Sequence, residues 1–370
     1  MKKSLIALAV AGAFAAPAFA ATGNVDVYGK LRVSLDYVDL NGGLESSWQL
    51  NDQTSRIGFK GSEDLGGGLK AIWQIEQALS SQGKLFGYDE FAAGGEFSNI
   101  GGGTLAGRNT FVGLSGDFGT VLAGRHDTPY KLVGSADIFA DTSADSQNGN
   151  QLGGIIGYDL DWNGIGGFDI RATNAIAYVS PSFSGVTVIG AVVPGESYDS
   201  GSKANGIADA YSLGVLYANG PLSLGLGYEM HTKDIVYDIT TGIYGSGNGI
   251  SENESAWKLN AGYAIGDLKL GATFESQDGV LGMKSTNYLV SAAYGMGPIT
   301  LAAQYGKRDP NSKANNILGD SDLTRYTLGA VYGFSKRTSA YFAYDHDKYE
   351  KGAFDGLKAN IYTIGLNHDF

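Results

Sequence analysis

Two segments near the N-terminus place basic residues at alternate positions between apolar ones. Lys30 and Arg32 lie in the first segment, and Arg56 and Lys60 lie in the second. A period of two is typical of β-strands, and it puts the four cations on one face of a sheet and the apolar residues on the other. Such a face makes no covalent bond, but its charges create a field that acts on ions and polar solutes.

Acidic residues that offset these cations are expected in the longest polar connection of the chain, residues 126–170. Asp137, Asp141 and Asp145 lie in this connection. Cations on a wall and acids on a loop, with water between them, would set up a transverse field and bias which ions pass. Two simpler interpretations stay open: the cations are solvated charges without a role in selectivity, and the aspartates belong to an ordinary exposed loop.

Metal, cofactor and enzyme chemistry find little support in the sequence. Asp159, Asp161 and Asn163 match the first half of a calcium-binding loop, but its twelfth position is Ile170 instead of glutamate. Cysteine is absent, which excludes disulfides and thiolate metal sites. We expect His368 on the apolar face of the last strand and the other histidines in loops, none beside a nucleophile elbow or in a zinc-binding spacing: His126, His231 and His346. We therefore predict no metal, no cofactor and no enzyme.

The elements that position the charged residues are repeated β-hairpins. Five tyrosines each end an alternating segment just before a short turn: Tyr178, Tyr217, Tyr263, Tyr294 and Tyr332. Seven such turns are expected near Leu65, Asp117, Pro181, Asn219, Gly266, Gly297 and Ser335, with one strand before them and one after them. An aromatic residue at one height on successive hairpins is typical of the girdle at a membrane–water boundary.

The hairpins predict an all-β fold, a sixteen-stranded antiparallel transmembrane β-barrel with short periplasmic turns and long extracellular loops. The long connections are expected at 39–53, 80–107, 126–170, 196–207, 231–253, 277–285, 307–322 and 346–358. An even strand number lets the first and last strands pair, which removes the edges that lipid does not tolerate. The last strand fits this role because alternate residues up to Phe370 share one apolar face.

Residues 1–20 have the features of a signal peptide, and we expect a single barrel domain over 21–370. The segment starts with Lys2 and Lys3, continues with apolar residues and ends in Ala18-Phe19-Ala20, a small-residue cleavage site. Without it the chain has 24 basic and 38 acidic residues, a net charge of −14. This balance argues against a nucleic-acid partner, because phosphates require a basic surface.

The chain resembles the trimeric general porins of Gram-negative outer membranes, and in particular their neisserial and related proteobacterial branch. The resemblance runs along nearly all of the chain after the signal peptide. It rests on Val27-Tyr28-Gly29-Lys30, on Thr54-Ser55-Arg56-Ile57-Gly58-Phe59-Lys60-Gly61, on Arg108-Asn109-Thr110-Phe111-Val112-Gly113-Leu114 and on the terminal Phe370.

This resemblance implies where a constriction would lie. In the family the third loop folds into the barrel, so residues 126–170 would narrow it, and basic wall residues face acids on this loop. The basic wall carries over to Lys30, Arg56, Arg108 and Arg171, and we expect Arg125, near the top of the fifth strand, to belong to it. Many relatives have a Pro-Glu-Phe-Gly sequence in the loop, which this chain lacks, so the path of the loop stays open.

The function expected from pattern and resemblance is passive diffusion of small hydrophilic solutes and ions across the outer membrane. The resemblance also implies a homotrimer among outer-membrane lipid and lipopolysaccharide, with the strand ending in Phe370 as a signal for the barrel-assembly machinery. A solute-specific porin and a surface adhesin or structural barrel are the alternatives. At least four cations oppose three acids, and screening confines their influence to about 8–10 Å at physiological salt, so we expect a weak preference for anions.

Overall fold

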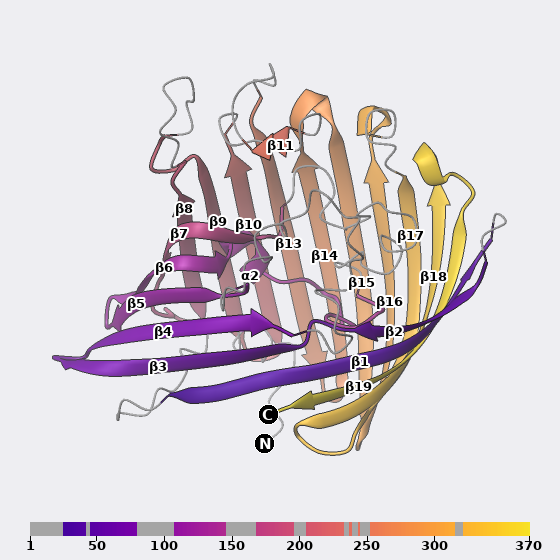
Figure 1. Ribbon diagram of the computed structural model, residues 1–370, viewed down its shortest axis with the longest axis horizontal. Coiled ribbons are helices and arrows are strands. Elements are labelled where there is room, and N and C mark those ends of the chain that lie inside the picture. Colours follow the sequence, from indigo (N-terminus) through magenta and orange to yellow (C-terminus); the bar gives the residue numbers. More distant parts are fainter. Residues whose placement is uncertain are drawn as a thin grey trace.

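The computed structural model is a closed barrel of antiparallel strands (Figure 1). Its sheet has seventeen strands, but β2 (Ser47–Asp52) and β3 (Arg56–Gly66) pair end to end with the same strand, β1 (Asp26–Leu40), so the ring has sixteen positions. The last strand, β19 (Lys358–Asp369), pairs with β1 and closes the ring. The predicted fold class and strand number are therefore confirmed.

The structure describes residues 25–41, 45–79, 107–145, 168–195, 205–232, 237–238, 243–244, 252–314 and 321–370. The predicted signal peptide lies outside these residues and stays a prediction. The remaining strands of the ring are β4 (Leu69–Ala78), β5 (Thr110–Gly116), β6 (Gly119–Asp127), β7 (Arg171–Val179), β8 (Val186–Val193), β9 (Ala210–Asn219), β10 (Leu222–His231), β13 (Glu254–Ile265), β14 (Leu268–Asp278), β15 (Lys284–Met296), β16 (Ile299–Pro310), β17 (Asp322–Gly333) and β18 (Thr338–Glu350).

Short elements occur outside the ring. The pair β11 (Tyr237–Asp238) and β12 (Ile243–Tyr244) forms a separate two-stranded sheet. The helical turns are α2 (Pro129–Leu132), η2 (Val280–Gly282) and η3 (Gly352–Phe354). Among the described residues, no helix is both long and apolar enough to cross a membrane.

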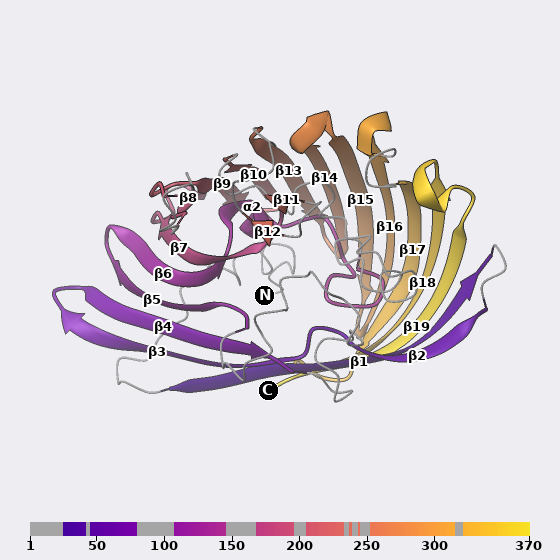
Figure 2. The same ribbon diagram turned by 45° about the horizontal axis from the view of Figure 1, so that its top comes forward.

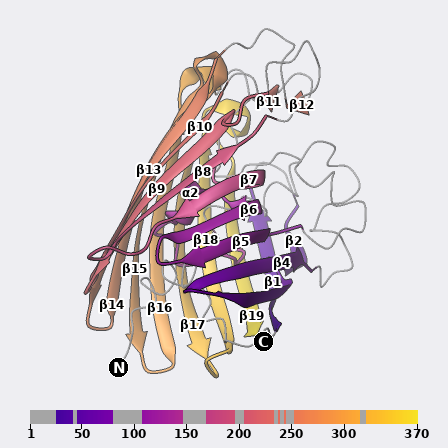
Figure 3. The same cartoon turned by 90° about the vertical axis from the view of Figure 1, so that its left-hand side faces the viewer.

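Short turns connect the hairpins at one end of the barrel, and the longer connections lie at the other end (Figure 3). The strands tilt within the wall, so that β3 to β6 run at a steep angle to β13 to β17 in Figure 1, as barrel closure requires. Several strands continue farther than the sequence pattern predicts. His126, His231 and His346, expected in loops, lie in β6, β10 and β18, because ladder pairing persists beyond the apolar band.

The outer face of the barrel carries two rows of aromatic residues. The predicted girdle is present, since Tyr178, Tyr263, Tyr294 and Tyr332 are exposed next to the short turns and Tyr217 is half-buried. A second row, which the sequence analysis missed, lies toward the other end of the strands. Its members Tyr211, Trp257 and Tyr326 are each six residues from a girdle tyrosine on the same strand, a separation of about 20 Å. Its ring contacts are Tyr211–Tyr228, Trp257–Phe274, Tyr305–Tyr326 and Tyr344–Tyr362. Two rows on either side of an apolar band are what both membrane interfaces require.

Candidate functional site

The connection between β6 and β7 enters the barrel, and Figure 2 shows α2 and the chain after it inside the ring. Thr128 caps α2 by accepting a hydrogen bond from the Lys131 amide, and Pro129 occupies the first turn, where its missing N–H is not needed. These features start a helical turn directly after β6. The chain is thereby directed across the interior instead of continuing the strand outward.

Polar residues of the inner wall hold this segment, residues 128–145, along its length. The Tyr130 amide donates to Ser212 on β9, and the Ala136 amide donates to Thr273 on β14. Ala136 also accepts a hydrogen bond from Ser291 on β15 at 2.6 Å. Farther on, the Ile138 amide contacts Gln304 on β16. The loop therefore follows the inner wall from β9 to β16 before it reaches β17 and β1.

Where the loop packs against the wall, a glycine leaves space for a loop side chain. A Cβ atom on Gly329 of β17 would lie 2.5 Å from the Phe139 ring, which is buried against the wall. Tyr341 and Ala343 of β18 complete the cluster around this ring. The close approach of loop and wall at this point requires glycine.

The tip of the loop brings one acid onto the basic wall. The Asp141 carboxylate lies 2.8 Å from the Arg32 guanidinium of β1 and 3.3 Å from the Arg56 guanidinium of β3. Lys30 pairs with Arg56 across the two strands, so these three cations occupy one patch. Burial opposes ionisation of Asp141, but Arg56 and Arg32 outweigh this effect and hold the pKa of Asp141 below its ordinary value. Asp141 is therefore an anion at neutral pH.

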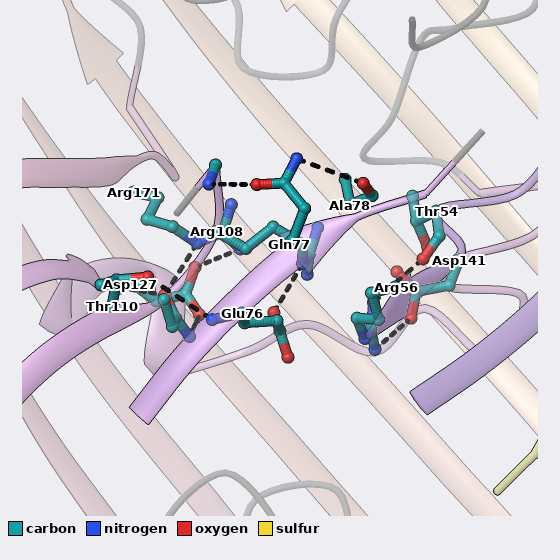
Figure 4. A network of polar contacts seen from close by, with 12 residues as sticks. Thr54, Arg56, Glu76, Gln77, Ala78, Arg108, Thr110, Asp127, Asp141 and Arg171 are labelled. Atoms are coloured by element: carbon teal, nitrogen blue, oxygen red, sulfur yellow. Dashed lines mark hydrogen bonds and ion pairs between the residues drawn. The ribbon is translucent and has the colours of Figure 1, made fainter. Parts of the chain in front are cut away.

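A second group of ion pairs lies beside this patch, and Figure 4 shows it together with the contact between Arg56 and Asp141. Arg108 binds Glu76 of β4 at 2.6 Å, and Arg171 of β7 binds Asp127 of β6 at 2.9 Å. Sequence analysis missed Glu76 because it looked for acids on the loop alone, and it missed Asp127 because within 126–170 it considered only Asp137, Asp141 and Asp145. Glu76 had a usable signal: it alternates with Trp73 and Ile75 on β4 and therefore faces inward.

The other predicted site residues lie apart from this contact. Lys60 lies over the Tyr28 ring at 5.4 Å, four residues from Arg56 toward the short turn. Arg125 pairs with Thr110 where β6 has a bulge, and no ion pair of its side chain occurs within the described residues. On the loop, Asp137 accepts a hydrogen bond from the Phe139 amide, and Asp145 accepts one from the Asp141 amide. Among the three predicted acids, Asp141 forms ion pairs with two residues of the predicted wall, Arg32 and Arg56.

The described ion pairs beside the loop involve more cations than acids. We call Lys30, Arg32, Arg56, Arg108 and Arg171 the wall cations. Three acids are paired with them in the described part of the chain: Glu76, Asp127 and Asp141. The guanidinium groups stay partly open to water, with side-chain exposures of 12–19%. The five wall cations thus outnumber by two the acids paired with them in the described part of the chain, and the guanidinium groups remain partly accessible.

A different set of charges holds the two stems of the loop, and we call it the stem cluster. It consists of Tyr130, Phe168, Asp169, Lys258 and Glu275. The Lys258 ammonium lies 2.9 Å from Asp169, 3.6 Å from Glu275 and 4.3 Å from the centre of the Tyr130 ring. Tyr130 and Lys258 are fully buried. The cluster joins the start and the end of the loop to β13 and β14.

A cavity opens between the loop stems and the wall formed by β6 to β10. It is lined mostly by small apolar residues, with Asp127, Glu229 and His231 at its polar side. His231 contacts Glu254 at 2.8 Å and Glu229 at 3.1 Å, and its ring stacks on Phe168. Within the described residues, acidic and histidine side chains do not gather into a metal-binding cluster. The Asp159–Asn163 motif lies outside these residues.

Comparison with known proteins agrees with this architecture. A family model described as Gram-negative porin matches residues 7–352. Outer membrane porin protein 32 of Delftia acidovorans is 31% identical over 99% of this chain and 95% of its own length. A major outer membrane protein P.IB of Neisseria gonorrhoeae is 32% identical over all of both chains.

Solved structures show the same barrel. One described as an anion-selective porin from Comamonas acidovorans superimposes with a TM-score of 0.71 at 25% identity, covering 94% of this chain and all of that chain. The trimer form of OmpT from Vibrio cholerae has a TM-score of 0.61 at 20% identity over 94% of this chain. With its closed barrel and its loop folded into the lumen, the chain belongs to the Gram-negative porin family and forms an outer-membrane channel for the passive diffusion of small hydrophilic solutes.

Proposed function

We propose that this channel passes anions in preference to cations and that the wall cations set the preference. The observation that carries the proposal comes from the described part of the chain, where ion pairs link three acids, Glu76, Asp127 and Asp141, to four of the five wall cations. The net charge of the whole chain is −12, but distant charges are screened beyond about 8–10 Å at physiological salt. A permeating ion therefore responds to the local excess.

The mechanism needs no covalent step. The loop leaves the Asp141 carboxylate 30% exposed next to Arg32 and Arg56, so a hydrated anion meets guanidinium groups that Asp141 satisfies only in part. Low-dielectric protein around the water-filled passage strengthens the field that the anion experiences. Small polar solutes exchange some hydration for these charged groups, whereas apolar solutes would displace oriented water without compensation. In this proposal no cofactor takes part.

Planar bilayer recordings test the selectivity. With a potassium chloride gradient across the bilayer, the reversal potential of the wild-type channel is expected to show a chloride-to-potassium permeability ratio above one. A ratio below one would mean that acids dominate the constriction and would refute the proposal. The similarity to a porin described as anion-selective supports the expected sign.

The assembly proposed for the channel is a homotrimer. One relative of this fold is described as a trimer, and the barrel exposes a continuous apolar face that lipid and neighbouring subunits would cover. In this proposal the aromatic rows meet lipid and lipopolysaccharide, and the barrel-assembly machinery recognises the strand that ends in Phe370. Native mass spectrometry in detergent is expected to give three times the mass of the mature chain. A monomer mass would refute the trimer.

A further inference from the structure

A buried ion pair on β17 and β18 lies behind the tip of the loop. The Arg325 guanidinium binds the Asp347 carboxylate in a fork, with two contacts of 2.7 Å. Both side chains are buried, with exposures of 8% and 0%. Arg325 has a third donor free of this fork, and it reaches the backbone carbonyl of Asp145 on the loop at 3.0 Å. A two-point ion pair fixes the guanidinium plane, and so it fixes the direction of this third donor.

Asp145 connects Arg325 to Asp141, the residue that faces the pore. Its side chain is 3% exposed and accepts a hydrogen bond of 2.8 Å from the Asp141 amide. Asp141 has a φ of 59°, a left-handed backbone conformation that is unfavourable for a residue with a side chain. The Arg32 guanidinium also donates a hydrogen bond of 3.2 Å to the backbone carbonyl of Asp141. The contacts on both sides of Asp141 thus maintain a conformation that the backbone alone would not prefer.

We infer that the Arg325–Asp347 pair positions the Asp141 carboxylate against Arg32 and Arg56 and thereby sets the ion preference of the channel. Arg325 and Asp347 are far from Asp141 in the sequence, and in this inference neither contacts the permeating ion. The inference deepens the proposed function and rests on it. Asp345 and Tyr349 of β18 also lie near Arg325, and Asp345 accepts a hydrogen bond from Thr327.

The inference predicts the effect of a substitution that keeps the charge. Arg325→Lys preserves the positive charge but loses the fork and the directed third donor, so Asp141 is expected to leave its left-handed conformation and its ion pairs. Asp141 would then offset less of the positive charge of the wall cations. If the Asp141 carboxylate moves roughly 10 Å away from the wall cations, the energy of a permeating ion beside them changes. This change is enough to raise the chloride-to-potassium permeability ratio about twofold. The matched control is Arg337→Lys, the same change on an exposed residue at a short turn.

A double-mutant cycle separates positioning from general damage to the barrel. If Arg325 acts through Asp141, Arg325→Lys is expected to leave the permeability ratio unchanged in an Asp141→Asn channel, because the carboxylate charge is already gone. Additive effects of the two substitutions would overturn the inference, as would a wild-type ratio for Arg325→Lys. An Asp141→Asn channel with the wild-type ratio would also overturn the inference, whereas a wild-type ratio below one would refute the proposed function, so the two failures are distinguishable.

A second variant covers the case that Arg325→Lys lowers the yield of folded barrel. Asp347→Glu also conserves charge, but it moves the carboxylate by one methylene and breaks the two-point geometry. It is expected to raise the permeability ratio in the same direction and to show the same loss of effect in the Asp141→Asn background. A wild-type ratio for a folded Asp347→Glu channel would contradict the inference.

Discussion

The wall cations and the stem cluster are both groups of charged residues inside the barrel, but they differ in burial. In the stem cluster the side chains of Lys258, Asp169 and Glu275 are 1%, 7% and 4% exposed. At the constriction Asp141 keeps 30% exposure, and Arg32 keeps 13%. Charges removed from water are costly unless they are paired, and then they fix a structure. Charges left partly hydrated contribute little to stability and remain available to solutes. Burial therefore distinguishes the stem cluster, a structural group, from the wall cations, for which we propose a functional role.

The largest expected effect concerns the stem cluster. Lys258→Met leaves Asp169 and Glu275 buried without their cation, which is expected to cost about 3–5 kcal/mol of unfolding free energy. Unfolding in denaturant, followed by the shift of the unheated barrel on a gel, measures this loss. Lys269→Met, on the neighbouring strand and only half-buried, is the matched control and is expected to change stability by less than about 1 kcal/mol. Equal losses for both variants would contradict the distinction.

A functional effect with little loss of stability is expected at the constriction. Asp141→Asn removes one negative charge next to Arg32 and Arg56, and the chloride-to-potassium permeability ratio is expected to rise about twofold to fivefold. The unfolding midpoint should stay close to that of the wild type because the pair is partly hydrated. Asp137→Asn serves as the control, since Asp137 caps the Phe139 amide within the loop. An equally large change for Asp137→Asn would remove the special role of Asp141.

The smallest expected effect is the response to pH. Because the pKa of Asp141 lies below the ordinary carboxyl value of about 4, its ion pairs are fully present above that value and are lost only as the pH falls through the lower pKa. The difference in permeability ratio between wild type and Asp141→Asn should therefore be the same at pH 7 and at pH 4.5. Reversal potentials at both values check this. A difference that disappears at pH 4.5 would show that Asp141 is protonated there.

Much of the barrel could be predicted because strand alternation is a local property. Period two places Lys30, Arg32 and Arg56 inward without knowledge of any partner, since the opposite face is apolar. The same rule places Lys258 inward between Trp257 and Leu259, which are exposed. It does not say that the loop covers Lys258 completely. Burial of that residue depends on Asp169 and Tyr130, which are far from it in the sequence.

The path of the loop could not be predicted for the same reason. Asp137, Asp141 and Asp145 have the same chemistry and spacing, and nothing local distinguishes the one that reaches the wall. The distinction comes from the left-handed backbone at Asp141 and from Arg325, which is 180 positions away from Asp145. Contacts between residues so far apart in the sequence form only when the barrel closes. The signal peptide is also predicted from a local sequence pattern, and it stays a prediction.

The most direct test of the account is the reversal potential of an Arg32→Gln/Arg56→Gln channel in a potassium chloride gradient. Removing both guanidinium groups leaves Asp141 without its ion pairs and removes two of the five wall cations, so the chloride-to-potassium permeability ratio is expected to fall toward one. A folded double variant that keeps the wild-type chloride preference would contradict the claim that these residues set the selectivity of the channel.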